Sequence, residues 1–577
     1  MSTKRTGAKA LAMVLGSALA LSACATSSDG GSGANTATSS AAAPVTITLG
    51  YAQEFSSYNN NTVEANALAN TVVLNQVLRG FYYFAPDGSI VRDTDIGTFE
   101  KTSDDPLTVK YTFSDNAVWS DGNQLDCDDA VFNWLTRNGK SGDKGFAPAS
   151  TSGWDQMAKP QCADGDKAFT VVYDTPYADW EGQFATFEPA HIAEAQGGVT
   201  DIIAAADKPT DPGLAKIIEF WNKGWALNPG ELKKDIMPAV GPYIIDSWTA
   251  GQSLTLKANE KWTGKKPAAS TIVVRYIEDT AQTQALQNGE VNIIEPQPQV
   301  DIVNQLKALG DKVKVQTGDQ FSFEHLDYNF KTEFSDLKVR QAFAKCVPRD
   351  QIVNNLLKPQ NPNGTIAQSR FIFPFQPEYA DYVSGLGAEQ YDKADVAGAK
   401  KLLADAGKTG MEVKIGWQKV PEAPNKRRVD TIALIKASCD QAGFKIVDGG
   451  TPTFFAKDLS AGSWDIALFA WIGSPLVSGD PSIYQTKKGG KGGQNNGQYS
   501  NPKVDALLDS VTRELDKAKV LEIRKQVDQL LWDDLATIPL FPFPGLVATD
   551  ATTSNVQINA TNNDITWNAF DWTRAAS

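Results

Sequence analysis

Hydrophobic and polar residues follow two different periods along most of this 577-residue chain. Short apolar runs of strand character lie at 45–50, 170–173, 253–257, 271–277, 411–417 and 465–471. Between several of these runs, apolar residues recur every three or four positions, which is the period of a helix with one buried face. The first such helix is expected over 63–81, directly after the first strand. This alternation of strands and helices predicts an α/β fold.

Three further helices carry start signals or regular apolar faces. A helix is expected over 125–135, where Asp128 and Asp129 place negative charge at its positive end. Near the C-terminus, a helix is expected to begin at Pro502 after Asn501, and a second one covers 520–531. The end of the chain is therefore expected to be helical.

The N-terminus has the pattern of an export signal. Three basic residues within 4–9 precede an apolar run over 10–21 that is too short to span a membrane. The sequence Leu21-Ser22-Ala23-Cys24 is similar to the lipobox of bacterial lipoproteins, in which the Cys becomes the lipidated first residue. An ordinary secretory signal is the alternative. We expect a signal peptide over 1–23 and a flexible tether over 24–44, which is rich in Gly, Ser, Ala and Thr.

Composition narrows the possible functions. Asp and Glu outnumber Lys and Arg by 68 to 54, so the formal charge of −14 would repel the phosphates of nucleic acid. The chain has 2 His and 5 Cys, too few for most zinc or multi-histidine iron sites. We therefore expect no nucleic-acid partner, no metal and no cofactor.

The four cysteines after Cys24 form an even set in a protein expected outside the cytoplasm. Three pairings are formally possible. Neighbourhood in the sequence favours Cys127 with Cys162 and Cys346 with Cys439. Buried free thiols remain the alternative.

Catalytic motifs are missing from the sequence. It contains no G-x-S-x-G, H-E-x-x-H or C-x-x-C pattern. Two Gly-Lys-Ser/Thr triplets, at 139–141 and 407–409, lack the earlier glycine of a phosphate-binding loop, because Trp134 and Leu402 stand there. We therefore expect a protein that is not an enzyme, and an extracytoplasmic hydrolase is the least favoured function.

Five stretches in a fixed order resemble the solute-binding proteins of bacterial ABC importers, in the oligopeptide/dipeptide-binding family (family 5). They lie at 111–132, 241–293, 327–343, 391–407 and 464–508. The second stretch departs from the family pattern at Asn292, where Asp is commoner. No single stretch is decisive, but their shared order identifies the chain as a member of this family.

The resemblance implies a two-lobed periplasmic-binding-protein-like fold (type II, cluster C) with an extra inserted domain. By analogy, 45–75, 237–318 and 540–577 form the core of lobe 1. Residues 76–236 form the inserted domain of lobe 1, and 319–539 form lobe 2. The two lobes are expected to close on a ligand about a hinge.

The resemblance also implies a function and its partners. We expect a lipid-anchored receptor that captures oligopeptides between the lobes and delivers them to the transmembrane subunits of an ABC permease. It is expected to be a monomer, on the outer face of the cytoplasmic membrane or in the periplasm. An oligosaccharide or another non-peptide solute is the alternative ligand.

Five ligand contacts are expected at and after the strand that ends near residue 472. They are Trp471, Ile472, Gly473, Ser474 and Asp480. Many peptide-binding members carry an Asp in the position of Ser474, where it holds the α-ammonium group of the ligand. Asp480 could replace that anchor through the longer loop, or the ligand could lack a free N-terminus. Packing in the core is the alternative role of Trp471.

Six more candidates are aromatic or histidine side chains near the expected cleft. By the resemblance or by their position after strands, they are Phe454, Tyr51, Phe55, Tyr58, Phe323 and His325. Each of them could instead be a core residue.

Overall fold

The computed structural model describes residues 45–142, 145–208, 210–421, 424–488, 491–561 and 564–575. The expected signal peptide, tether and lipidation site at Cys24 lie outside the described residues. All elements described below belong to the unit Pro44–Ser577.

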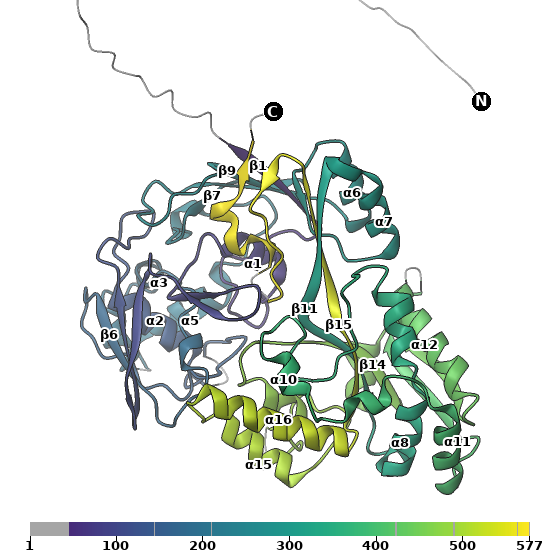
Figure 1. Cartoon of the computed structure of the whole chain (residues 1–577). Coiled ribbons are helices and arrows are strands. Elements are labelled where there is room, and N and C mark those ends of the chain that lie inside the picture. Colours follow the sequence, from purple (N-terminus) through teal and green to yellow (C-terminus); the bar gives the residue numbers. More distant parts are fainter. Residues whose placement is uncertain are drawn as a thin grey trace, which may run out of the picture. The chain divides into compact units, whose positions relative to one another are not determined.

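A ten-stranded mixed sheet organises this unit, and its long strands β11 and β15 run side by side through the middle (Figure 1). Neighbouring strands are parallel in β13–β12–β14 and in β10–β1–β9, whereas the others pair antiparallel. In spatial order the strands are β13 (Lys445–Thr451), β12 (Glu412–Gln418), β14 (Ile466–Ile472), β11 (Val313–Tyr328), β15 (Thr537–Asp550), β10 (Ile293–Ile294), β1 (Thr46–Tyr51), β9 (Thr271–Tyr276), β8 (Ser253–Ala258) and β7 (Tyr243–Thr249).

Three small sheets and sixteen α-helices complete the described residues. The small sheets are β4 (Gly97–Asp104), β5 (Leu107–Phe113) and β6 (Ala168–Val172); β2 (Tyr82–Phe84) and β3 (Ile90–Arg92); and β16 (Thr553–Ser554) and β17 (Thr573–Arg574). The helices are α1 (Leu68–Leu74), α2 (Cys127–Arg137), α3 (Ala190–Gly197), α4 (Ile202–Ala206), α5 (Pro212–Glu219), α6 (Asp279–Gln287), α7 (Val300–Ala308), α8 (Leu337–Cys346), α9 (Arg349–Ile352), α10 (Tyr379–Val383), α11 (Val396–Asp405), α12 (Lys426–Cys439), α13 (Leu459–Ala461), α14 (Asp480–Tyr484), α15 (Pro502–Val511) and α16 (Lys517–Asp533).

Most predicted elements are confirmed, because their local signals agree with their surroundings. All six predicted strands are present, as β1, β6, β8, β9, β12 and β14. Helix α2 begins with a capping box, in which the Asp126 side chain accepts from backbone N–H groups and Asp129 accepts from the N–H of Asp126. The side chain of Asn501 caps α15 and that of Asp516 caps α16, each by accepting backbone N–H groups of the first turn. The α/β fold is therefore built largely from signals within each segment.

The helix predicted over 63–81 is wrong in its extent, because only Leu68–Leu74 are helical. Before it, the Asn60 side chain accepts the N–H of Ala67 at 2.9 Å, which favours a turn. After it, the carbonyls of Gln76 and Val77 accept N–H groups from the segment 240–243. Tertiary hydrogen bonds therefore replace the two ends of the predicted helix.

Buried side chains form two large clusters. The first core draws its residues from 47–293 and 547–572, and it holds the fully buried Trp119, Trp221 and Trp225. The second core draws its residues from 326–541. Strands β11 and β15 pass from the side of one core to the side of the other (Figure 1).

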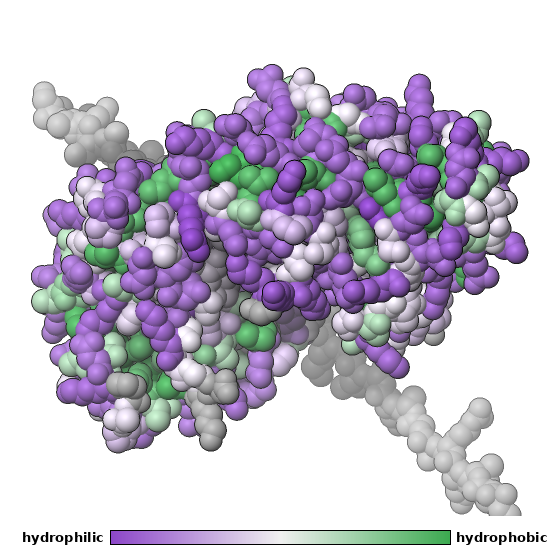
Figure 2. Space-filling view, turned by 90° about the horizontal axis from the view of Figure 1, so that it is seen from below, coloured by the Kyte–Doolittle hydropathy of each residue, from purple (hydrophilic) through white to green (hydrophobic). Residues whose placement is uncertain are grey.

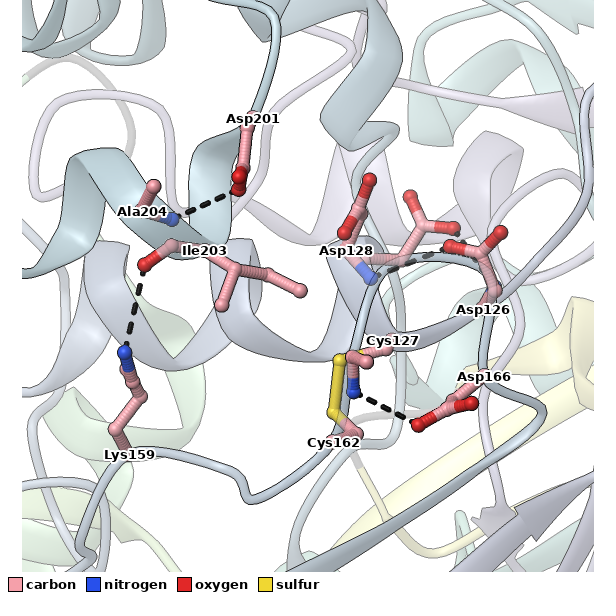
Figure 3. Close-up of a disulfide and its surroundings, with 11 residues drawn as sticks. Asp126, Cys127, Asp128, Lys159, Cys162, Asp166, Asp201, Ile203 and Ala204 are labelled. Atoms are coloured by element: carbon pink, nitrogen blue, oxygen red, sulfur yellow. Dashed lines mark hydrogen bonds between the residues drawn. A yellow bond between two sulfur atoms is a disulfide. The ribbon is translucent and has the colours of Figure 1, made fainter.

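Both predicted disulfides are present. Cys346 joins Cys439 between α8 and α12, and Cys127 joins Cys162. Figure 3 shows the second bond at the start of α2, where the Cys127 N–H also donates to the carbonyl of Asp166 at 3.0 Å. Near it, Lys159 donates to the carbonyl of Ile203 at 3.4 Å. The bond therefore fastens the loop before β6 to a helix of the first core.

Removing the Cys127–Cys162 disulfide should destabilise the protein. The bond closes a loop with a sequence separation of 35, so its loss frees the unfolded chain. In the double variant C127S/C162S we expect the free energy of unfolding, measured with urea, to fall by about 2 kcal/mol or more. The control is the native protein with this disulfide intact. A loss below about 0.5 kcal/mol would contradict the expectation.

The face of the protein shown in Figure 2 is mostly polar. In Figure 2, hydrophobic residues form separate patches among hydrophilic ones. The large apolar side chains that are most exposed are Val63, Phe455 and Val420, and they come from different segments. Within the described ranges, none of the helices combines the length and hydropathy that a bilayer span requires.

Candidate ligand-binding cleft

A cavity of about 250 Å³ lies beside β11 and β15, at the carboxyl ends of β1 and β10. We call it the cleft cavity. Its walls come from segments that are far apart in the sequence, some near the first core and some near the second. The lining residues are Tyr51, Leu68, Glu295, Pro296, Gln297, Pro298, Gln320, Ser322, Ala470, Phe543, Gly545, Leu546, Asn559, Ala560, Thr561 and Asp564.

Parallel pairing places two of the polar lining residues next to each other. In the β1–β10 register, Leu49 pairs with Ile293 and Gly50 with Ile294. The next residues along the two strands are Tyr51 and Glu295, and both line the cavity. The carboxyl ends of parallel strands are a common place for ligands in α/β proteins.

An irregularity in the pairing of β11 with β15 forms another wall. Asp319 pairs with Pro544 and Phe323 with Pro542, so three residues of β11 face one residue of β15. Gln320, Ser322 and Phe543 lie in this interval, and all three line the cavity. Bulges of this kind redirect side chains and are frequent beside binding sites.

One edge of β14 is open next to this wall. On one side, β14 pairs with β11 along its whole length. On the other side, β14 pairs with β12 only at Ile466 and Ala467. From 468 to 472, therefore, this edge has no strand partner among the described residues, and we call it the open edge. Ala470 lines the cleft cavity.

The charge that lines the cleft cavity is negative. Among the described residues, the lining contains Glu295 and Asp564 but no Lys, Arg or His. The Tyr51 hydroxyl donates to Oδ2 of Asp564 at 3.1 Å, and the N–H of Ile565 donates to Oδ1 at 2.6 Å. Oε2 of Glu295 is buried and has no hydrogen-bond partner among the described residues. Burial, followed by the charge of Asp564, raises the pKa of Glu295 and also the pKa of Tyr51.

Of the residues expected to contact the ligand, Tyr51 lines the cleft cavity directly. Ile472 ends β14, and Gly473 follows it with its N–H donated to the carbonyl of Phe321. Ser474 is exposed in the next loop. Ile472 is therefore the last residue of the open edge, and Gly473 and Ser474 follow it without lining the cavity.

Other candidates lie in packed aromatic clusters. His325 is fully buried, with ring centroids 4.4 Å from Phe469 and 5.7 Å from Trp471. Phe323 is also buried and packs against His325. Phe454 is buried under β14, while its neighbour Phe455 is 51% exposed and contacts Phe469 beside the open edge.

Two candidates near the N-terminus belong to the first core. Phe55 packs against Trp248, and the Tyr58 hydroxyl donates to the carbonyl of Pro238. Both side chains are fully buried and neither lines the cleft cavity.

Asp480 is engaged in an ion pair. Its carboxylate accepts from Nε of Arg524 at 2.7 Å and from Nη2 at 3.0 Å. Burial raises the pKa of Asp480 to about 6, although Arg524 opposes the shift. Arg524 also donates to the carbonyl of Leu476, so the pair braces the loop after β14. We therefore leave Asp480 out of the proposed ligand contacts.

Sequence reasoning missed most of the cavity lining. Glu295 lies two residues after the family-like stretch that ends at Ile293, directly after β10, which is not among the predicted strands. Asp564 has a φ of 57°, which is unusual for a residue other than glycine, and it comes from the C-terminal segment. No local pattern predicts that it lies beside Tyr51.

Comparisons with known proteins agree with this architecture. The family model "Bacterial extracellular solute-binding proteins, family 5 Middle" matches residues 94–494. An uncharacterized lipoprotein of Mycobacterium tuberculosis is 28% identical over 539 residues, covering 90% of this chain and 91% of the relative. The oligopeptide-binding protein OppA of the same species is 26% identical over 509 residues, covering 86% and 80%. The solved periplasmic EDTA-binding protein EppA has a TM-score of 0.80 at 23% identity, covering 92% and 97%.

The chain belongs to family 5 of the bacterial extracellular solute-binding proteins, because the family model covers more than half of it. Members of this family are the solute receptors of ABC importers, and one of the relatives is an oligopeptide-binding protein. Family membership implies a solute, a permease and a location in the cell envelope or periplasm. The likeness to EppA supports the fold.

Proposed function

We propose that this protein captures oligopeptides in the cleft cavity and delivers them to the transmembrane subunits of an ABC permease. The observation that carries the proposal is the open edge of β14 beside that cavity. An extended peptide can pair its backbone groups with an unpaired strand edge, which gives affinity with broad side-chain selectivity. The similarity to oligopeptide-binding OppA supports the same ligand class.

The two cores support the proposed lobes. We assign 45–75, 237–318 and 540–577 to the core of lobe 1 and 76–236 to its inserted domain, with 319–539 as lobe 2. The first and second cores divide at nearly the same places. In this assignment β11 and β15 cross between the lobes, and their irregular pairing is the proposed hinge.

We further propose that Cys24 carries a lipid and that 24–44 tether the receptor to the outer face of the cytoplasmic membrane. The lipobox-like sequence supports this anchor, and so does the similarity to a mycobacterial lipoprotein. The tethered receptor is proposed to act as a monomer.

Mass spectrometry of small molecules released from the purified, denatured protein tests the proposal. We expect peptides to be released. In a second arm, the native protein is incubated with defined peptides and glycans, and a binder should return all of them unchanged. Release of a sugar or a metal chelate without peptide would contradict the ligand class. Accumulation of cleavage products would instead indicate a hydrolase.

A further inference from the structure

Two carboxyl groups line the cleft cavity without a compensating cation. Asp564 is 9% exposed, and Glu295 stands beside it, where a side-chain hydrogen bond between the two carboxyl groups helps to raise the pKa of Glu295; Oε2 of Glu295 is buried and has no hydrogen-bond partner among the described residues. Each charge raises the cost of ionising the other, as the raised pKa of Glu295 indicates. Buried carboxylates in proteins are normally paired with a cation. The described part of this site does not supply one.

The surrounding groups keep Asp564 fixed as an acceptor. The Tyr51 hydroxyl and the N–H of Ile565 each donate to one of its oxygens. Both donors hold the carboxylate in place, and neither neutralises its charge. Glu295, on the adjoining strand end, shares a hydrogen bond with Asp564 and lines the same cavity, so that it becomes a second acceptor when it loses its proton.

Other charged groups near the cavity do not change its sign. Asp279, at the start of α6, adds further negative charge that acts on Tyr51 and Glu295. Arg427 packs over the Phe543 ring at 4.2 Å and donates to Gln360 at 3.3 Å. Arg428 is paired with Glu324 at 2.6 Å. Neither arginine is a lining residue.

A positively charged ligand group is the chemical complement of this wall. A neutral sugar would leave the charges unpaired, and an anionic chelate would be repelled. A metal ion is less suitable, because the described residues contain no group of three or more metal-ligating His, Cys, Asp or Glu side chains. An ammonium group has three donors and can satisfy two carboxylates at once.

We propose that Glu295 and Asp564 bind a primary ammonium group of the solute, with Tyr51 positioning Asp564. The identification of that group as the α-ammonium of a peptide rests on the proposed function above. The anchor would then lie on the strand ends of β1 and β10. It would replace an Asp after β14, where this chain has Ser474.

Ligand binding at this site should depend on pH. A bound ammonium group lowers the pKa of Glu295 from its raised value in the free protein, so binding releases a proton. The affinity for the ligand should therefore rise with pH over the range in which Glu295 of the free protein loses its proton. The titratable groups that interact at this site are Tyr51, Asp279, Glu295 and Asp564.

The test uses the native full chain and three probes. The probes are a defined mixture of short peptides with free N-termini, the same peptides acetylated on every amine, and spermidine. Binding is measured by native mass spectrometry and calorimetry at pH 6 and pH 8. We expect the free peptides to bind, and acetylation to weaken binding about 10- to 100-fold, the range expected for losing a charged hydrogen bond.

Glu295→Gln and Asp564→Asn should each weaken binding of the free peptides by a similar factor and flatten the pH dependence. Glu278→Gln is the matched control. Glu278 is exposed and does not line the cavity, and its substitution removes the same charge. Its affinity should stay within about twofold of the native value. Thermal unfolding of Glu295→Gln should show an unchanged or higher Tm, which separates lost binding from lost folding.

The outcomes separate this anchor from the peptide proposal. If free and acetylated peptides bind equally, the anchor is overturned and the peptide receptor stands. If spermidine binds, no peptide does, and Glu295→Gln abolishes spermidine binding, the ammonium site stands and the peptide proposal falls. If none of the probes binds, or if Glu295→Gln leaves binding unchanged, the anchor is overturned.

Discussion

Arg370→Met should lower the free energy of unfolding by about 3–5 kcal/mol, the range for breaking a buried ion pair on one side. Arg370 and Asp528 are both fully buried in their side chains, and Nη1 of Arg370 donates to Oδ1 of Asp528 at 2.7 Å. The guanidinium also donates to the hydroxyl and carbonyl of Thr537, at 2.7 and 2.6 Å. The substitution leaves the Asp528 carboxylate without its cation.

The pair joins α16 to the segment before α10 and to the first residue of β15. Trp532 stacks over the guanidinium at 4.5 Å, which fixes the side chain further. The pair lies within the second core, so its loss should destabilise that core. The free energy of unfolding is measured with urea and followed through tryptophan fluorescence. The ligand-free protein is used, so that binding does not add to stability.

A matched surface pair controls for the loss of charge. Lys401 and Asp405 are paired one helical turn apart on α11 and are largely exposed. Lys401→Met should change the unfolding free energy by about 0.5 kcal/mol or less. The double variant Arg370→Met/Asp528→Leu should recover part of the loss, because both buried charges are then gone. An Arg370→Met loss equal to that of Lys401→Met would show that the pair contributes little.

The fold could be predicted where local signals and burial agree. The apolar run at 465–471 becomes β14 between two neighbouring strands, and Asn501 with Pro502 opens α15. The prediction at 63–81 is wrong in extent because the carbonyls of Gln76 and Val77 bond with a distant segment. A helical period cannot reveal such a competitor.

The cleft was harder to predict than the fold. Tyr51 was named because it follows the first strand, and the structure places it in the cavity. Asp480 is a candidate because it is the next acidic residue after Ser474, but the structure pairs it with Arg524 on another helix. Aromatic residues that follow a strand can pack in the core instead of lining a site, as Phe55 does. Proximity in the sequence therefore indicates the region of a site and leaves the contact residues undetermined.

Contacts between the proposed lobes bear on how the cleft closes. Asp179, in the proposed inserted domain, is buried and accepts from the N–H of Val477 at 3.1 Å and from the N–H of Ser478 at 2.8 Å. Both donors lie in the loop that follows β14. The N–H of Ala178 donates to the carbonyl of Thr512 at 2.8 Å. The bonds from Val477 and Ser478 tie the loop after the open edge to the proposed inserted domain, and the bond to Thr512 ties the end of α15 to the same segment.

Asp179→Ala should weaken ligand binding about 100-fold, because two charge-assisted hydrogen bonds of about 1.5 kcal/mol each are lost from the closed arrangement. The apparent affinity falls by the same factor as the population of the closed form. Ligand dissociation should be correspondingly faster, and small-angle scattering should show a more open average form. The neighbouring variant Glu181→Gln removes ion pairs with Lys517 and Arg92, which are both exposed, and we expect a change of about twofold or less. If Asp179→Ala binds as tightly as Glu181→Gln, these bonds do not hold the lobes together, and closure must depend on the ligand itself.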